Sequence, residues 1–537
     1  MKTSGRRWRR RCAGLLAVAA MSSACAWQSE DGGRAVTAGR PVKYTVGMIG
    51  DDGGGTPAKG GTLTFAAYSE AGLLDPAQTI VAGSTGGVEM AAIYDVLMRW
   101  DAGSGQVRPQ LAEDLKPDGD GTAFTLTLRD GVKFSDGTPL DAQAVKWSIE
   151  RYVKDGGDEA ALWKSNVTAV ETHGDRTVVF KLANKWPTFP YLLTTGPGMI
   201  VAKSSDAGGG FKPVGAGPFT FERYRPKEET LLKANPGYWG GRPNLDRVRM
   251  VYVDDPNAAL DTLKSRRIQA AFLRDPVAVQ KALKAGEHGF LSMVSLGNVA
   301  VINATAGHPG ADPRVRRAMA YAIKPEVIYE RAYPGTGLAS SALFPESSAL
   351  HTGAAPLPYD PGKARELLKQ AKADGYDGKV TYLDAQDPAS RTTALAIKAM
   401  LENAGFKVEL DLVRSVADQT SKVAVRRDYD VSGWGISWRD SGPFGRMYAT
   451  LHAKGNLTVG MATTPEMSGL IEELRGAATL DEQRGVMARV QRQWNEDVPA
   501  LVFGPQPELV AWPETVHGVA GTTNSMVLLG DAWISKG

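Results

Sequence analysis

The chain has very little cysteine. Its 537 residues contain two, Cys12 and Cys25, and both lie within the first 26 residues. The rest of the chain can therefore form no disulfide bond, and its stability must come from a buried core. With 43% of its residues hydrophobic, the chain is long enough to build that core in two or three lobes.

Long apolar runs are also missing. The run near the N-terminus, "CAGLLAVAAM", is about half as long as a bilayer-spanning helix, and no other stretch comes closer to that length. Arginines precede this run and the small residues "SSACA" follow it, a pattern typical of an export signal over residues 1–26. We therefore expect an exported protein without a transmembrane helix in its mature form.

Two cleavage sites fit this signal. The stretch "SSAC" has the small residues and the cysteine of a lipoprotein signal, which would leave Cys25 as a lipidated N-terminus, but Ser22 stands where such signals usually have leucine. The stretch "ACA" before Trp27 fits ordinary secretion, and the paired arginines are compatible with the twin-arginine route. The expected location is a cell-surface lipoprotein, anchored to the outer face of the cytoplasmic membrane by its lipid alone, or a soluble periplasmic or secreted protein.

An excess of positive charge is absent from the body of the chain. Six of the 62 lysines and arginines lie in residues 1–26, which leaves 56 against 59 aspartates and glutamates. Nucleic-acid binding normally requires a strongly basic surface. This charge balance therefore argues against a nucleic-acid partner.

Catalytic motifs are absent as well. The chain has no G-x-S-x-G elbow, no phosphate-binding G-x-x-x-x-G-K-[ST] loop, no H-E-x-x-H and no G-x-G-x-x-G after a strand. Its six histidines are scattered and none is spaced four residues from another, which argues against a helical metal site. We expect no catalytic residue, no cofactor and no metal centre.

The organisation of the body is visible in its hydrophobic periodicity. Residues 27–60 are rich in glycine and small polar residues and predict a flexible tether. From Gly61 onward strand and helix patterns alternate, as in an α/β lobe. After Ala306 long helices and the strand-helix-strand pattern of residues 379–413 predict a second α/β lobe.

Residues 99–214 differ from both of these lobes. Alternating apolar residues around Asp130-Gly131 predict a hairpin, and a second hairpin is expected to turn at 173–175. Between them, Val145, Ile149 and Tyr152 share one face of an expected helix. This segment predicts a small α+β lobe of its own.

Several stretches in one order resemble a single family, the oligopeptide- and dipeptide-type extracellular solute-binding proteins (family 5) that serve ABC importers. The likeness covers about residues 61–520. Its most specific part is "LAEDLKPDGDGTAFTLTLRDGVKFSDGTPLDAQAVKWSIER" at 111–151. The other stretches are "LLDPA" at 73–77, "VGAGPFTFERY" at 214–224, "ANPGYWGGRPNLDRV" at 234–248, "DPRVRRAMAYAI" at 312–323, "YDPGKARELLKQA" at 359–371 and "YDVSGWG" at 429–435.

The resemblance implies a periplasmic-binding-protein-like α/β fold, with two α/β lobes joined by a hinge and a small α+β lobe inserted in the first. It also implies a non-enzymatic, monomeric receptor with a peptide or other small solute as ligand and an ABC permease and its ATPase subunits as partners. The expected boundaries are 61–98, 215–306 and 497–537 for the first lobe, 99–214 for the inserted lobe and 307–496 for the second lobe.

The resemblance also assigns ligand-facing positions in "GWGISWRDSGPF" (433–444). The backbone of Gly433, Trp434 and Gly435 is expected to pair with an extended ligand, because glycine allows close approach. Trp434 and Trp438 are expected to be aromatic walls of the site, or alternatively core residues. In the first lobe the same correspondence brings Glu70 and Ala71 to the ligand side.

Near the hinge the correspondence points to Asn303. Peptide-binding members typically have G-W-x-x-D, whose aspartate binds the ammonium of the peptide, because a buried charge needs a partner. Here Ser437 occupies that position. Asp440 matches a second acidic position and is an alternative partner, unless the adjacent Arg439 neutralises it.

Peptide therefore remains the default ligand, and Ser437 keeps a non-peptide solute such as a sugar, a metal chelate or another metabolite as an alternative. Two other functions stay open, namely a sensory receptor that presents its ligand to a membrane partner and a secreted hydrolase built on the same fold.

Overall fold

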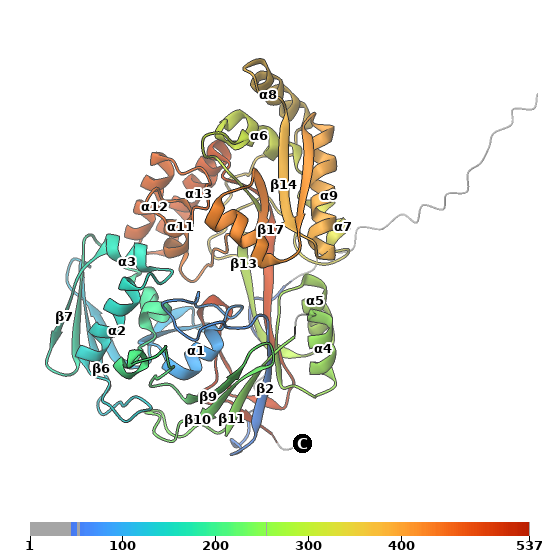
Figure 1. The fold of residues 1–537 in the computed structure, drawn as a ribbon. Helices are drawn as coiled ribbons and strands as arrows, with labels where there is room; N and C mark the ends of the chain where they lie inside the picture. The colour runs from blue at the N-terminus through green and yellow to red at the C-terminus, as the bar shows by residue number, and fades with distance from the viewer. Residues whose placement is uncertain (1–43, 51–53, 254, 536–537) are drawn as a thin grey trace, which may run out of the picture. The chain divides into compact units, whose positions relative to one another are not determined.

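One mixed β-sheet runs through the part of the chain that the computed structural model describes, residues 44–50, 54–253 and 255–535 (Figure 1). Its strands are β1 (Gly47–Ile49), β2 (Thr62–Ala67), β9 (Phe219–Arg225), β10 (Glu229–Ala234), β11 (Arg247–Tyr252), β12 (Ala270–Leu273), β13 (His288–Ile302), β14 (Lys379–Ala385), β15 (Lys407–Val413), β16 (Val431–Trp434) and β17 (Ala500–Trp512). They lie in the order β15, β14, β16, β13, β17, β12, β2, β11, β10 and β9, and β1 pairs with β13 beside this path.

The long strands β13 and β17 join two halves of this sheet. They pair antiparallel from His288 opposite Trp512 to Val301 opposite Ala500. One end of the pair adjoins β12 and β2, and the other end adjoins β16 and β14, so the two strands run from one lobe into the other (Figure 1). The register shifts between Val294 and Asn298, and a break in the ladder bends a strand pair. The expected two-lobe α/β fold is confirmed, with this irregular pairing at the join.

Aspartate-proline pairs start many of the helices that cover the sheet. In α4, α5, α6, α8 and α9 the aspartate side chain accepts a hydrogen bond from a backbone N–H of the first turn, and proline follows it. Proline suits this position, because its missing N–H would have no partner inside the helix. These helices are α4 (Pro256–Lys264), α5 (Pro276–Lys284), α6 (Pro313–Ala322), α8 (Pro361–Ala373) and α9 (Pro388–Asn403).

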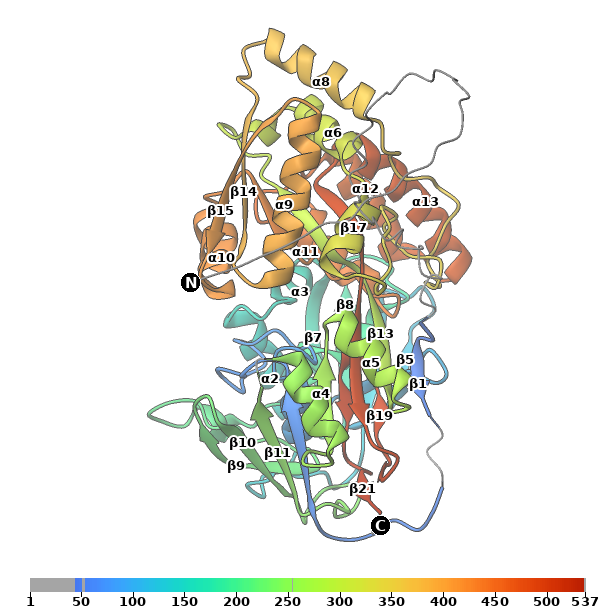
Figure 2. The ribbon, with the colours of Figure 1, turned by 90° about the vertical axis from the view of Figure 1, so that its right-hand side faces the viewer.

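The other helices complete the two lobes. Helix α9 packs on the parallel strands β14 and β15, which confirms the strand-helix-strand unit expected at 379–413 (Figure 2). The remaining helices of the two lobes are α1 (Gly87–Tyr94), α7 (Pro325–Ala332), α10 (Val416–Thr420), α11 (Pro443–Leu451), α12 (Pro465–Gly476) and α13 (Leu480–Asp497), with the π-helical turn η5 (Ser421–Arg426) and the 3₁₀ turns η4 (Pro309–Ala311) and η6 (Thr523–Ser525).

A separate antiparallel sheet forms the core of the small lobe, in the order β5, β6, β8 and β7. Helix α2 packs on this sheet, and Val145, Ile149 and Tyr152 lie on its buried face, as expected from the sequence. The elements of the segment are β3 (Met98–Asp101), β4 (Gln106–Pro109), β5 (Ala112–Pro117), β6 (Ala123–Leu128), α2 (Ala142–Lys154), α3 (Ala160–Asn166), β7 (Val167–His173), β8 (Thr177–Leu182), η1 (Phe189–Thr194), η2 (Gly196–Gly198) and η3 (Lys203–Asp206).

The structure corrects one of the two expected hairpins. Strands β7 and β8 pair around the turn at 173–175 as predicted. The hairpin predicted at Asp130-Gly131 does not form, because β6 pairs with β5 and β8 instead. The chain turns back one step later, where Phe134 N–H donates to the carbonyl of Thr138 across Asp136-Gly137. An Asp-Gly pair marks a turn, but the alternating strand before it can choose a more distant partner.

The expected tether also differs from the structure in its last part. Strand β1 pairs antiparallel with Gly289–Leu291 of β13, and Tyr44 is 6% exposed. Its hydroxyl accepts a hydrogen bond from Gly337 N–H. This edge of β13 would otherwise have unpaired N–H and C=O groups, which favours the addition of a strand. Residues 27–43, and the signal with Cys25, lie outside the described residues.

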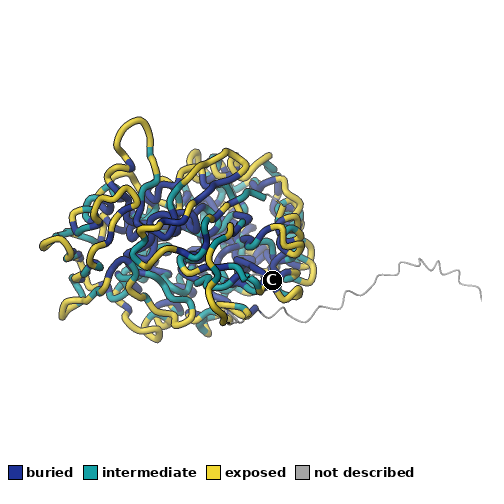
Figure 3. Tube along the Cα trace, turned by 90° about the horizontal axis from the view of Figure 1, so that it is seen from below, coloured by how far each residue is buried: buried dark blue, intermediate teal, exposed yellow. Residues whose placement is uncertain are grey.

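The C-terminal segment returns to the first lobe. After β17 it forms the short strands β18 (Val516–His517), β19 (Ala520–Gly521), β20 (Val527–Leu528) and β21 (Trp533–Ile534). Buried stretches run through the middle of the trace, and exposed stretches lie mainly outside them (Figure 3). Over the residues with described positions, no helix has the length and apolar character needed to cross a membrane. The lobe boundaries given above stay a prediction.

Candidate functional site

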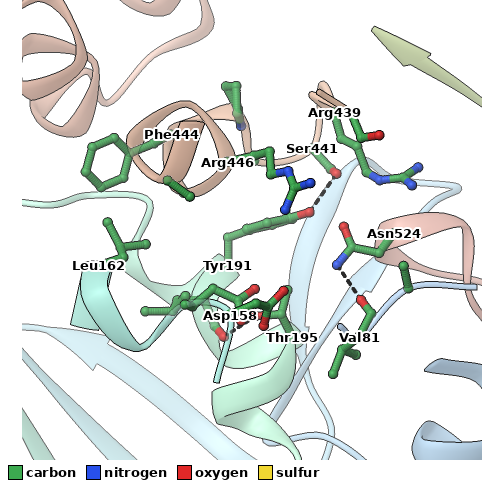
Figure 4. Close-up of a pocket in the computed structure, with 18 of the residues that line it drawn as sticks. Val81, Asp158, Leu162, Tyr191, Thr195, Arg439, Ser441, Phe444, Arg446 and Asn524 are labelled. Atoms are coloured by element: carbon green, nitrogen blue, oxygen red, sulfur yellow. Dashed lines mark hydrogen bonds between the residues drawn. The ribbon is translucent and has the colours of Figure 1, made fainter. Parts of the chain in front are cut away.

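A cavity of about 240 Å³ lies where the two lobes and the small lobe meet. The first lobe contributes the loop at 80–85, Arg274 of the β12-α5 connection and Glu508 of β17. The small lobe contributes the segments at 158–162 and 186–195. The second lobe contributes the loop before α11 and the first turns of that helix. Segments more than 300 residues apart in the sequence therefore line one cavity (Figure 4).

Two arginines share one buried glutamate on the first-lobe side of the cavity. Glu508 is 2% exposed, and its carboxylate lies 3.0 Å from Nη2 of Arg439 and 3.4 Å from Nε of Arg274. Burial by itself would raise the pKa of Glu508, but the charges of Arg439 and Arg274 outweigh it and hold the pKa below its usual value. Ser525 Oγ donates to the same carboxylate at 2.6 Å. This network fixes the loop after β16 against β17.

Two carboxyl groups adjoin each other on the small-lobe side. Oδ1 of Asp158 lies 2.8 Å, and Oε2 of Glu159 2.5 Å, from the hydroxyl of Tyr152. A hydroxyl has one proton, so it donates to one of them at a time. Burial, and next the charge of Asp158, raise the pKa of Glu159 well above its usual value. Burial and the neighbouring negative charge both disfavour the charged form of Glu159.

Arg446 projects toward the cavity from α11 on the second-lobe side (Figure 4). Its Nε donates to the carbonyl of Ile436 at 2.9 Å, which orients the guanidinium. Burial lowers the pKa of Arg446, and the charges of Asp158 and Glu159 oppose that effect from across the cavity. Within the described part of the chain no carboxylate lies within 4.0 Å of this guanidinium, so its charge has no direct ionic partner.

Tyr191 of η1 connects the three parts around the cavity. Its hydroxyl lies 3.0 Å from Ser441 Oγ of the second lobe and also hydrogen-bonds Thr523 Oγ1 of the first lobe. Tyr191 lines the cavity together with Arg446 and Asp158 (Figure 4). The cavity thus has an aromatic wall, supplied by the small lobe.

Ser437 is the residue of the predicted set that lines this cavity. Its φ of 63° lies in the left-handed region, and its N–H donates to Leu296 of β13 at 3.3 Å. Gly435 borders the same place, because a Cβ there would lie 3.6 Å from Nη2 of Arg274. Ser437 and Gly435 therefore lie near Arg274, and no carboxylate of the described segment 433–444 lines the cavity beside them.

Strand β16, which precedes Gly435 and Ser437, has hydrogen-bond partners within the protein. Gly433 and Trp434 pair with Ala300 and Val299 of β13. On the other side of the strand, the carbonyl of Gly433 accepts a hydrogen bond from Gln419 Nε2 at 2.7 Å, and a Cβ at 433 would lie 2.3 Å from Asp384 Oδ2. Glycine is therefore needed at 433 for the approach of Asp384. Pairing of a ligand with the backbone of Trp434 and Gly435 stays a prediction.

Trp438 and Asp440 point away from this cavity. Trp438 is 0% exposed and packs between Phe344 and Trp494 at ring distances of 5.9 Å and 5.8 Å. This burial corrects its expected role as a wall of the site and favours the alternative of a core residue. Asp440 accepts hydrogen bonds from Ser348 Oγ and Ala349 N–H and lines a second cavity of about 190 Å³. In this arrangement it does not replace the carboxylate missing at 437.

The predicted residues of the first lobe and the hinge have partners within the protein. Glu70 accepts hydrogen bonds from the Tyr224 hydroxyl and from Lys227 N–H at 2.7 Å, outside the cavity. Ala71 is buried at 3% exposure. Asn303 is 0% exposed, and its Nδ2 donates at 3.0 Å to the carbonyls of Arg427 and Tyr429. None of the three residues lines this cavity, and their place in the ligand site stays a prediction.

Asn303→Ala should therefore lower stability more than ligand binding. The change leaves two buried carbonyls and Thr305 N–H without this partner, so we expect the free energy of unfolding to fall by about 2 kcal/mol. Denaturant titration measures the loss, with Asn257→Ala at the surface as control, expected to change stability by less than about 0.5 kcal/mol. An unchanged stability with lost solute binding would restore Asn303 to the site.

The charged groups of the cavity carry no motif in the sequence. The adjacent pair Asp158-Glu159 looks like any solvated turn, Arg274 stands beside Asp275 after an apolar strand, and Glu508 stands alone in another. One signal exists for Arg446, which is the single charge in the apolar helix "PFGRMYATL". A lone charge among buried side chains needs a partner, and here the partner is absent from its own helix.

Comparison with known proteins shows that the chain matches a protein family. The profile described as "Bacterial extracellular solute-binding proteins, family 5 Middle" matches residues 106–457. The glutathione-binding protein GsiB of Salmonella paratyphi A is 33% identical over 290 residues, which are 52% of this chain and 55% of GsiB. The chain thus spans about half the length of the curated relatives it matches.

Two solved structures have the same fold. The oligopeptide-binding protein AppA of Bacillus subtilis, in complex with a nonapeptide, has a TM-score of 0.76 at 22% identity and covers 90% of this chain and 100% of its own. The binding protein AgaA of A. tumefacien R10, in complex with agropinic acid, has a TM-score of 0.74 at 24% identity and covers 89% of this chain and 99% of its own.

Proposed function

Because this chain belongs to the bacterial extracellular solute-binding proteins of family 5, we propose that it is the receptor of an ABC importer. It binds a small solute between two closing lobes and delivers it to a membrane permease with ATPase subunits. The observation that carries this proposal is the cavity whose walls come from both lobes and the small lobe. Such a site is complete only when the lobes are together, so ligand and closure stabilise each other.

The strands β13 and β17 support this mechanism. They are the main-sheet connection between the lobes, and their pairing is irregular between Val294 and Asn298. A bend at that place moves the loop at 437–446 toward or away from the small lobe. Arg446 and the Asp158-Glu159 pair then face each other across the cavity only in the closed arrangement.

The ligand is proposed to be a small peptide or a peptide-like metabolite. Relatives in this fold bind ligands as different as a nonapeptide and agropinic acid, and GsiB binds glutathione. A volume of about 240 Å³ lies below the usual range of about 300–1,000 Å³ for ligand pockets. This size supports a compact solute over a long peptide, and Ser437 keeps sugars, metal chelates and other non-peptide solutes as alternatives.

The receptor is proposed to bind its solute without changing it. Among the described residues that line the cavity there is no histidine or cysteine, so Ser437 and Ser441 have no imidazole base beside them. The same cavity would also serve a sensory receptor. Genes for a permease and ATPases beside the gene of this protein would support import.

Export as a monomer anchored through a lipid on Cys25 is part of the same proposal, with ordinary secretion as the alternative. The lobe boundaries at 99, 215, 307 and 497 are proposed with it. A tethered receptor keeps its solute near the permease.

Titration of the purified protein with di- to pentapeptides and their N-acetylated forms tests the proposal. A solute present at 100 times its dissociation constant should add about 2.7 kcal/mol to the free energy of unfolding, which thermal unfolding detects. Sugars and metal chelates form the second set of solutes. If no member of either set stabilises the protein, the receptor function is contradicted, and turnover of a bound solute would identify an enzyme.

A further inference from the structure

The start of α11 forms a place for an anion inside the cavity. Gly442 is the N-cap of this helix and offers no side-chain hydrogen bond to its first N–H groups. Gly442, Pro443 and Gly445 line the cavity, and the guanidinium of Arg446 lies in the same wall. Unpaired N–H groups at a helix start and a nearby guanidinium both favour a carboxylate or phosphate.

The opposite wall has the reverse character. Asp158 and Glu159 reach the cavity from the loop before α3, and the hydroxyl of Tyr152 holds both carboxyls on one side. They lie close enough to Arg446 for their charges to act on it, but they form no ion pair with it. The cavity therefore has a cation, Arg446, on one wall and an acidic pair, Asp158 and Glu159, on the other, and the two walls form no ion pair with each other.

The charge of the whole lining limits the ligand further. Among the described residues that line the cavity, three are arginines and three are carboxylates: Arg274, Arg439, Arg446, Asp158, Glu159 and Glu508. Glu508 is already shared by Arg274 and Arg439. Equal numbers of positive and negative side chains line the cavity, which favours a ligand that carries charges of both signs.

Resting on the proposed function, we propose that the solute is a compact zwitterion derived from an amino acid, with its carboxylate at Arg446 and the start of α11. Its ammonium lies at Asp158 and Glu159. The acidic pair of the small lobe thereby takes the role of the carboxylate that is missing at Ser437. The ligand spans from the small lobe to the second lobe, and its two ends are what hold these lobes together.

Calorimetric titration tests both ends. The probes are the twenty free L-amino acids and the dipeptides of each with alanine. For the tightest probe, the C-terminal amide and the N-acetyl derivative are then compared with the free form. Loss of either charge should weaken binding about 30-fold or more, which corresponds to about 2 kcal/mol.

Variants assign each end to its wall. In Arg446→Gln the amide and the free acid should bind equally, while the N-acetyl form remains weaker. In the double variant Asp158→Asn with Glu159→Gln the reverse is expected. Arg446→Lys keeps the charge and should retain part of the preference for the free acid. Arg489→Gln, on the half-exposed surface of α13, is the control and should bind as the unchanged protein does.

The outcomes separate this inference from the receptor function. A solute without charged ends that binds while no zwitterion does would overturn the inference and leave the receptor function standing. Equal binding of amide and free acid to the unchanged protein, or unchanged discrimination in Arg446→Gln, would also overturn it. Thermal unfolding of each variant without solute shows whether the variant is folded. If Arg446→Gln does not fold, the test is made with Arg446→Lys.

Discussion

Trp438→Ala is expected to lower the free energy of unfolding by about 4 kcal/mol, whereas Trp434→Ala should cost roughly 1–2 kcal/mol. The two tryptophans stand four residues apart in one glycine-rich stretch. Trp438 is 0% exposed, packs on Phe344 and Trp494, and donates from Nε1 to Thr450 Oγ1 at 3.3 Å. Its loss leaves a cavity in the core and removes one hydrogen bond from Thr450, whose hydroxyl still donates to the Arg446 carbonyl, while Trp434 is only half-buried against the same core.

Denaturant titration followed by circular dichroism measures both changes, since the loss of tryptophan would disturb a fluorescence signal. Trp434→Ala is the matched control, because it removes the same side chain from the same segment. Equal losses in the two variants would contradict the assignment of Trp438 to the core. Loss of solute binding in Trp438→Ala with unchanged stability would return this residue to the ligand site.

Glu508→Gln is expected to destabilise the protein by roughly 3 kcal/mol. The change removes the negative charge that Arg439 and Arg274 share, and these side chains are only 13% and 27% exposed. Two guanidiniums with little access to water would then repel each other at the cavity. The loop before α11 would lose its ionic contact with β17, so weaker solute binding should accompany the loss of stability.

Glu229→Gln provides a matched control for this prediction. Glu229 is also buried, at 3% exposure, and has three arginine partners, Arg223 and Arg249 at 2.5 Å each and Arg225 at 3.8 Å. Its partners Arg223 and Arg249 are 45% and 47% exposed, so water can solvate them when the carboxylate is lost. We expect a cost of at most about 1 kcal/mol. Similar losses at both sites, measured by denaturant titration, would refute the special role of Glu508.

The pH dependence of stability should differ between Glu508→Gln and the unchanged protein. The pKa of Glu508 is held below its usual value, so its stabilising contribution is complete above the unfolded pKa of about 4.3 and is lost as the pH falls through the folded value. Glu508→Gln should therefore lose less stability than the unchanged protein between neutral and acidic pH. An identical slope in both would contradict the paired state of this carboxylate.

Much of the local structure follows from short stretches of sequence. Asp360-Pro361 starts α8, the apolar stripe of α2 faces the small sheet, and the unit at 379–413 forms as expected. Each depends on neighbours within a few turns, or on a hydrophobic period that sets which face is buried. The family, too, is confirmed by the profile that matches 106–457.

Local signals were insufficient where a strand had a choice of partners. The turn at Asp130-Gly131 predicted a hairpin, yet β6 pairs with β5 and β8. Residues 47–49 looked like part of a tether, yet they complete an edge of β13. In both cases a hydrogen-bonding edge from a distant part of the chain decided the pairing, and hydrophobic period alone does not encode such an edge.

The stretch "GWGISWRDSGPF" shows which features the sequence alone predicts and which it does not. Its residues carry part of the family resemblance and predict a strand that ends on the ligand side. Only the tertiary structure decided that Trp438 belongs to the core, that Gly433 accommodates Asp384, and that Ser437 meets Arg274 at the cavity. The charges that complete the site come from positions 158, 159, 274, 446 and 508, which become neighbours because β13 and β17 join two lobes around one space. The interaction between two charges depends on their distance in space, and the hydrophobic period of a sequence does not reveal that distance.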